Sequence, residues 1–240
     1  MNLDEQIIPW ILRTHIAAGA VSLVVAPLAL AVAKGGTWHR RWGRIYFYGM
    51  LVVCASAVFI GVARPQDFWL ALVAVFSFHL VASGYRSLYL KKLHQGLKPA
   101  TLDLWLHGLA GVFNAGLLIW GLSHLFMGVR DVKATLYTVF GGIGMAMVVV
   151  NLSKFYKRKH DKREWFFGHV GGMLGGYIAT VSAFSAVNFG SWFPWMPTWL
   201  VWLWPTLIGV PLIFLVTASY RRRFAKGVRV REIAEIRIRH

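Results

Sequence analysis

The chain has 240 residues, of which 57% are hydrophobic and 15% charged, and its mean hydropathy is +0.55. Soluble domains carry about 25% charged residues, so this composition excludes an ordinary soluble globular protein. The formal net charge is +17, but the basic residues lie between long apolar runs, which is typical of membrane proteins and gives no reason to expect nucleic acid as a partner.

Seven apolar runs are long enough to cross a bilayer, because a hydrocarbon core of about 30 Å needs roughly 20 helical residues. In chain order they cover residues 7–33, 45–63, 68–90, 104–126, 134–153, 165–188 and 198–219. The alternating segments of a membrane β-barrel are missing. The sequence therefore predicts an all-α integral membrane bundle of seven transmembrane helices, a single domain over residues 1–219, followed by a basic tail at 220–240.

The first run is preceded by Asp4 and Glu5. A secretory signal has positive charges there, so we expect this run to be a retained helix.

The basic residues indicate the orientation. Four segments hold 22 of the 26 Lys and Arg residues, and the connections between them hold three. The four segments are residues 34–44, 86–98, 154–163 and 221–239. The positive-inside rule places such segments in the cytoplasm. We therefore expect the amino terminus outside and the carboxyl terminus in the cytoplasm of a bacterial inner membrane, with the lipid bilayer as partner.

Two segments outside the runs allow two interpretations each. The connection FGSWFPWMPTW is uncharged and contains three tryptophans, which fits an aromatic belt at the membrane interface or a lid over a substrate. The basic tail fits a topology anchor or a segment that docks on anionic lipid.

The runs lack several kinds of functional group. They contain no Asp or Glu, which excludes the carboxylate relays of many pumps and transporters. The last run has no lysine for a retinal Schiff base, and the common hydrolase and nucleotide-binding motifs are missing from the chain.

The runs do contain five histidines: His15, His79, His107, His124 and His169. Counted from the ends of the runs at 1.5 Å per residue, His107 and His169 fall near the cytoplasmic boundary, and His15 and His79 fall deeper on the outer side. His124 is explained as an exposed residue near the outer interface. Each histidine taken alone fits a hydrogen-bonded packing residue.

Paired imidazoles on different helices are the axial ligands that six-coordinate haem b requires. Small residues follow three of these histidines by one helical turn, which would leave space for a porphyrin: Gly19, Ser83 and Gly111. His169 lies in GHVGGMLGG, whose glycine row fits close helix packing or clearance for a cofactor. The sequence therefore predicts His15, His79, His107 and His169 as iron ligands.

Two further polar features accompany the histidines. Asp103, His107, Gly111 and Asn114 form a stripe on one helical face, in which Asp103 could hold the second ring proton of His107 or cap the helix. The segment KGGTWHRRWGR contains His39 and Arg44 and could hold a haem propionate, a lipid headgroup or a quinone carbonyl. The segment is also explained if its basic residues only set the orientation of the protein in the membrane.

Several stretches together resemble a bacterial family of multi-pass membrane proteins known only as a domain of unknown function. They are THIAAGAVSLVVAPLAL, KGGTWHRRWGRIYFYGM, FSFHLVASGYRSL, HVGGMLGGYIATVSAFSAVN and WPTLIGVPLI, in that order. The resemblance covers residues 15–213 and implies a membrane protein in which His15, His39 and His169 match recurring histidines. It implies no activity.

The leading functional hypothesis is a haem-b redox protein that transfers electrons, with quinone or another membrane subunit as partner. The alternative is a non-enzymatic membrane protein, either transporter-like or a subunit of a membrane complex, whose histidines are structural or contact a metal. A smaller variant is a metal site that uses His39 with His107 or His169.

Overall fold

The computed structural model describes residues 7–129 and 131–227. Over these residues the chain is helical, with seven helices that are long and apolar enough to cross a membrane. They are α2 (Ile8–Ala31), α3 (Thr37–Ala63), α4 (Phe68–Arg86), α5 (Thr101–Phe126), α6 (Val132–Tyr156), α7 (Glu164–Trp192) and α8 (Thr198–Ala225). Three short 3-10 turns join them: η1 (Pro65–Asp67), η2 (Ser87–Tyr89) and η3 (Leu93–Gln95). The seven predicted helices are confirmed in number and order.

The helices and the predicted apolar runs end at different residues. Helix α3 begins at Thr37, before the run that starts at residue 45, and α8 continues to Ala225, because basic residues are good helix formers and a helix can extend beyond the lipid. Helix α4 ends at Arg86, before the end of its run at residue 90, and a 3-10 turn follows it. Hydropathy locates the part of a helix that lies in lipid, whereas backbone hydrogen bonds decide where the helix ends. The last part of the predicted tail, residues 228–240, lies outside the described residues.

The chain divides into two compact units. Unit 1 comprises Met1–Ala74 and Val210–His240, and unit 2 comprises Val75–Gly209. The single domain predicted for residues 1–219 stays a prediction.

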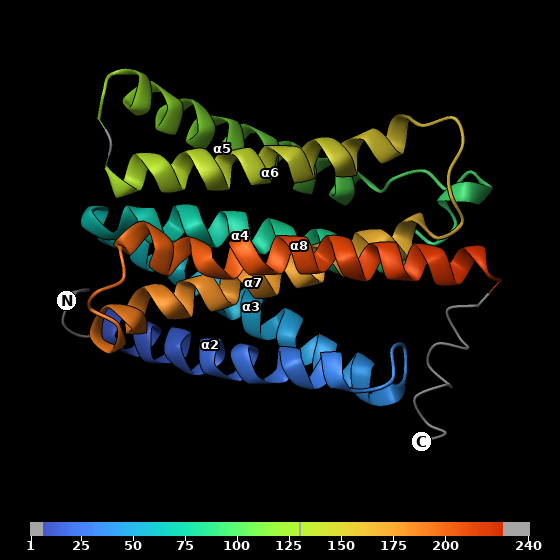
Figure 1. The fold of residues 1–240 in the computed structure, drawn as a ribbon, viewed down its shortest axis with the longest axis horizontal. Helices are drawn as coiled ribbons and strands as arrows, with labels where there is room; N and C mark the ends of the chain where they lie inside the picture. Colours follow the sequence, from blue (N-terminus) through green and yellow to red (C-terminus); the bar gives the residue numbers. More distant parts are fainter. Residues whose placement is uncertain (1–6, 130, 228–240) are drawn as a thin grey trace. The chain divides into compact units, whose positions relative to one another are not determined.

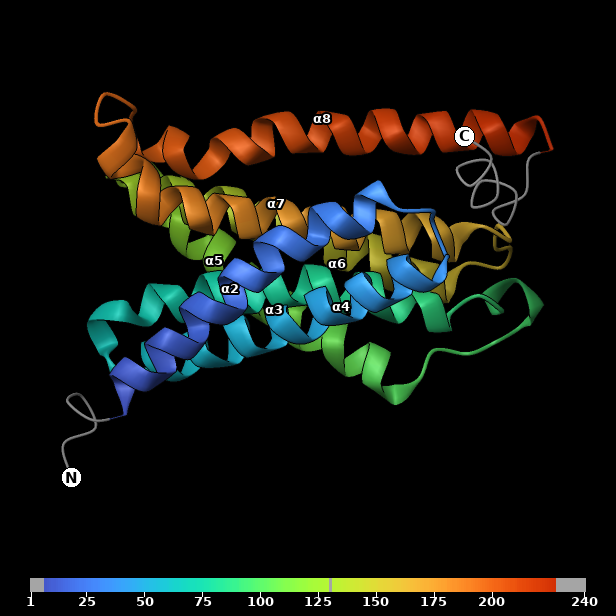
Figure 2. The same ribbon diagram turned by 90° about the horizontal axis from the view of Figure 1, so that it is seen from below.

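Unit 1 is built on the antiparallel pair α2 and α3 (Figure 2). Polar contacts join the two helices along their length, and Gly49 allows a close approach: a Cβ at this position would lie 2.5 Å from Oγ of the buried Ser22. Small residues at the crossing let two membrane helices pack without a hydrophobic driving force.

Unit 2 contains two closely packed helix pairs. Helices α5 and α6 lie side by side in Figure 1, and a Cβ on Gly141 of α6 would lie 2.6 Å from the Leu118 nitrogen of α5. Helices α4 and α7 meet at Gly84 and Gly172, where a Cβ on Gly172 would lie 2.5 Å from the Gly84 Cα. Close packing is therefore confirmed for Gly172, the central glycine of the predicted row.

The outward surface of the helices is apolar. Val112 is 78% exposed, Val187 80% and Phe126 88%, and side chains of this kind are favourable only where lipid or protein covers them. Trp192, Trp195 and Trp199 at the connection of α7 and α8 are also exposed, as side chains of an interfacial aromatic belt are.

We expect Gly84→Ala to destabilise the protein by about 1–3 kcal/mol, because the new methyl group would meet the backbone of α7, 2.7 Å from the Met173 nitrogen. Thermal unfolding of the detergent-solubilised chain measures this. The control is Gly116→Ala in α5, where a Cβ meets no atom within 4 Å, so the substitution should be neutral or slightly stabilising. Equal melting temperatures for Gly84→Ala and the wild type would contradict the proposed close packing.

Candidate functional site

The most distinctive polar contact of unit 2 is a direct pair of imidazoles. Nε2 of His79 on α4 lies 3.1 Å from Nδ1 of His107 on α5, and the two rings meet edge to face with centroids 5.3 Å apart. His79 is 2% exposed and His107 3%. One ring therefore donates an N–H to the other inside the apolar region of the protein, and the direction depends on the tautomers.

The depth estimate that separates His79 from His107 is wrong. His79 is seven residues from the end of α4 at Arg86, and His107 is six residues from the start of α5 at Thr101. Because α4 ends earlier than its apolar run, both histidines lie about two turns from the same end of unit 2. Two axial ligands of one iron have nitrogens about 4 Å apart, twice a typical metal–nitrogen bond. At 3.1 Å the contacting nitrogens of His79 and His107 are joined by a hydrogen bond instead.

An ion pair joins α4 to α5 beside the histidines. Arg86 donates from Nε to Oδ1 of Asp103 at 2.7 Å and from Nη2 to Oδ2 at 2.9 Å. The Ala100 N–H also donates to Oδ2 at 2.9 Å. The fully buried carboxylate of Asp103 therefore also accepts a hydrogen bond from the backbone at the start of α5. Of the two interpretations of Asp103, capping of α5 is confirmed with one change: Asp103 is the third residue of the helix, and its carboxylate accepts the N–H of the N-cap residue Ala100. The predicted bond to His107 is replaced by the pair with Arg86.

Lys154 of α6 is a buried cation in the same region. It is 8% exposed, and its ammonium donates to Oδ1 of Asn151 at 2.7 Å. Within the described residues this is the one acceptor that the ammonium contacts. Gly168 of α7 makes room for it, because a Cβ there would lie 3.0 Å from the Lys154 Nζ and 2.6 Å from the Ser87 Oγ.

Three histidines bind backbone carbonyls of neighbouring helices through Nδ1. His169 of α7 contacts the Gly84 oxygen at 3.0 Å, His15 of α2 the Val53 oxygen at 3.1 Å, and His39 of α3 the Ala29 oxygen at 2.9 Å. A carbonyl can only accept, so the proton of a neutral ring lies on Nδ1 and the lone pair on Nε2. This is the tautomer that presents Nε2 to a metal.

The remaining predicted residues contribute less. Arg44 lies on α3 and is exposed. His124 bonds the Trp120 oxygen of its own helix at 3.0 Å and stacks on the Trp120 ring. Over the described residues, no group of three or more His, Cys, Asp or Glu side chains is arranged to hold a metal ion. The assignment of His15, His39, His79, His107, His169 and Arg44 to a haem stays a prediction.

Two members of this polar site, the half-buried Arg86 and the buried Lys154, are not predicted by the sequence. The charge pattern explains both as cytoplasmic charges, although Arg86 follows His79 by two turns and Lys154 follows Asn151 by three residues. Those spacings place each pair on one helical face, which was the available signal. Three members of the predicted stripe on α5, Asp103, His107 and Asn114, are buried at 3% exposure or less, and the fourth, Gly111, is half-buried.

We expect Arg86→Met to destabilise the protein by about 3–5 kcal/mol, because it leaves the Asp103 carboxylate buried and unpaired. The double variant Arg86→Met, Asp103→Leu should recover much of that loss. The control is Lys157→Met, which breaks the partly exposed pair with Glu164 and should cost less than about 1 kcal/mol. Thermal unfolding in detergent measures all three, and similar losses for Arg86→Met and Lys157→Met would contradict the buried ion pair.

Comparisons of the chain with protein-family models, with curated proteins and with solved structures find no match.

Proposed function

We propose that this is a multi-pass membrane protein that transfers protons through unit 2, with His79 and His107 as the relay. One observation carries the proposal: two buried imidazoles on different membrane helices are in direct hydrogen-bond contact at 3.1 Å. Ionisable side chains are costly inside a membrane protein, and histidine chains there mark proton pathways. This is a transporter-like function.

The second nitrogen of His79 supports this role. Its Nδ1 is buried and has no hydrogen-bond partner among the described residues. An unpaired buried polar nitrogen costs about 1–3 kcal/mol and so calls for an explanation, which proton transfer provides. In the relay, His107 accepts a proton on Nε2 and passes its Nδ1 proton to Nε2 of His79, and His79 then releases its Nδ1 proton to a water molecule that enters the site. Both rings return to their first tautomer before the next proton.

Access to the relay is provided at the end of unit 2 where α4 ends and α5 begins. The Phe155 ring lies with its centroid 6.1 Å from that of His107, and Phe155 also lines a cavity between two connections. Phe155 therefore borders both this cavity and the imidazole pair. In this proposal, protons reach His107 from the cavity past Phe155.

The orientation and location follow from the charges. We place the amino terminus outside and the basic connections in the cytoplasm of a bacterial inner membrane. The common position of two basic connections, residues 87–100 and 157–163, at one cavity of unit 2 supports this arrangement. Membership of the family of unknown function that the sequence resembles is part of the same proposal.

We expect purified wild-type protein in liposomes to acidify their interior when a potassium gradient with valinomycin drives protons inward. An internal pH-sensitive dye measures the rate. His79→Gln and His107→Gln should each slow acidification by about 100-fold, the usual contribution of a positioned proton-transfer group. Glutamine can form hydrogen bonds at these positions, but it has no ring nitrogen that takes up and releases a proton. The control is His124→Gln, whose histidine bonds its own helix and should keep the wild-type rate.

Two outcomes would overturn the relay. One is a wild-type rate equal to that of protein-free liposomes, and the other is an unchanged rate in both glutamine variants.

A second candidate function, electron transfer by haem b, is favoured by the environment of His15. Its Nδ1 lies 3.1 Å from the Val53 oxygen and 3.0 Å from the Ser56 Oγ, so Nδ1–H is held and Nε2 carries the lone pair. His39 and His169 have the same tautomer by the same argument, and Arg44 could pair with a propionate. When bound, haem b would supply one-electron redox chemistry, with quinone as a fitting partner.

For this second candidate we expect protein purified from haem-replete cells to show a Soret band that sharpens on reduction with dithionite. His15→Ala should reduce or shift the band, because it removes an oriented ligand, whereas His124→Ala should leave it unchanged. Metal analysis of the same sample tests the smaller variant, in which His39 and a second histidine bind a single metal ion. A colourless, metal-free wild-type preparation would overturn both, and it would leave the proton relay to be judged by its own assay.

A further inference from the structure

Unit 2 contains a basic cavity of ≈ 530 Å³. It lies between the connection of α4 to α5 and the connection of α6 to α7, which Figure 1 shows at the same end of the helices. Its lining residues are Leu93, His94, Gly96, Leu97, Lys98, Pro99, Phe155, Lys157, Arg158, Lys159 and His160. Gly96 shapes one wall, because its φ of 87° lies in the left-handed region and turns the chain back after η3.

The charges of this cavity are largely uncompensated. Glu164 pairs with Lys157 at 2.8 Å and with His160 at 3.0 Å. Lys98, Arg158 and Lys159 have no carboxylate within ion-pair distance among the described residues. Three cations that converge on one cavity without a counter-ion create a local positive potential that attracts an anion.

Four of the residues that line the cavity are apolar: Leu93, Leu97, Pro99 and Phe155. Leu93 is buried and Leu97 is 41% exposed. Phe155 belongs to α6, a helix that is apolar enough to cross the membrane. The cavity therefore combines basic and apolar lining residues.

We infer that this cavity binds a phosphate group, and that its source is the headgroup of an acidic phospholipid. Arg and Lys are the side chains that bind phosphate, and basic pockets at the cytoplasmic ends of membrane helices bind acidic lipid headgroups. The apolar lining residues offer contact to an acyl chain, which free phosphate does not have. This inference goes beyond the proton relay and does not depend on it.

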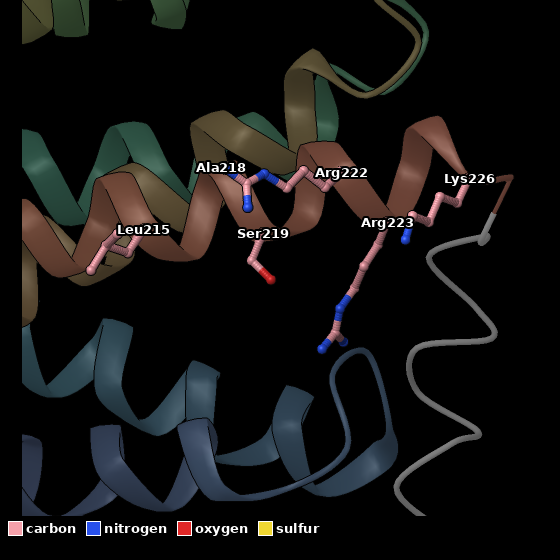
Figure 3. A pocket seen from close by; sticks show the side chains of 6 residues that line it. All are labelled: Leu215, Ala218, Ser219, Arg222, Arg223 and Lys226. Carbon is pink, nitrogen blue, oxygen red and sulfur yellow. The ribbon is translucent and has the colours of Figure 1, made fainter.

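A second basic pocket of ≈ 210 Å³ in unit 1 provides a matched control. Its residues all come from α8: Leu215, Ala218, Ser219, Arg222, Arg223 and Lys226. Figure 3 shows the Arg222 and Arg223 side chains leaving the helix in different directions. This pocket is smaller and is lined by a single helix, so the same amount of charge on α8 should give weaker binding.

Native mass spectrometry of the full chain in a neutral detergent tests the inference. The probes are phosphatidylglycerol, phosphatidylcholine and inorganic phosphate, each added separately. We expect the wild type to bind one phosphatidylglycerol about tenfold more tightly than phosphatidylcholine. The variant Lys98→Gln, Arg158→Gln, Lys159→Gln should lose this preference. The charge-preserving variant Lys98→Arg, Arg158→Lys, Lys159→Arg and the control Arg222→Gln, Arg223→Gln, Lys226→Gln should keep it.

The outcomes separate the sources of phosphate. Binding of phosphatidylglycerol but not of inorganic phosphate supports a lipid site. Binding of inorganic phosphate that the cavity variant abolishes supports the phosphate site and assigns it to a soluble ligand. Three results would overturn the inference: a cavity variant that binds both probes as the wild type does, a control variant that loses binding equally, or a charge-preserving variant that loses it.

Discussion

The bidentate ion pair between Arg86 and Asp103 fixes how α4 and α5 lie against each other. Arg86 is two turns beyond His79, and Asp103 is one turn before His107, so the ion pair joins the same two helices as the imidazole pair, one to two turns away, and the long Arg86 side chain spans the difference. The geometry of a guanidinium and a carboxylate allows little sliding. The His79–His107 contact, and with it the proposed relay, therefore depends on this pair.

The buried polar groups of unit 2 differ in how many hydrogen bonds and countercharges they have. Asp103 accepts three hydrogen bonds and carries the countercharge of Arg86, whereas Lys154 contacts one acceptor and His79 keeps one nitrogen unpaired. Complete compensation is typical of groups that hold a structure together. Incomplete pairing is costly. In unit 2 it occurs at His79 and Lys154, where we propose proton transfer, and also at Asn114 and Ser182, whose side-chain oxygens are buried without a hydrogen-bond partner among the described residues.

Glycine contacts give these polar groups their positions. Gly84 and Gly172 let the backbones of α4 and α7 approach closely, and that approach places the Gly84 oxygen 3.0 Å from Nδ1 of His169. Gly168 leaves the space that the Ser87 hydroxyl and the Lys154 ammonium fill. The glycine row of α7 thus serves helix packing and the buried polar site together, because a missing side chain allows both.

The sequence by itself determined the number and order of the helices and the buried stripe on α5, because hydropathy and helical periodicity are local properties of the chain. It did not determine the helix ends or the partners of the histidines. Only the tertiary structure paired His79 with His107 and Arg86 with Asp103, because these contacts depend on where α4 stops and on the register set by distant residues. A shift of one helical turn, about 5.4 Å, would separate both pairs without changing any hydropathy signal.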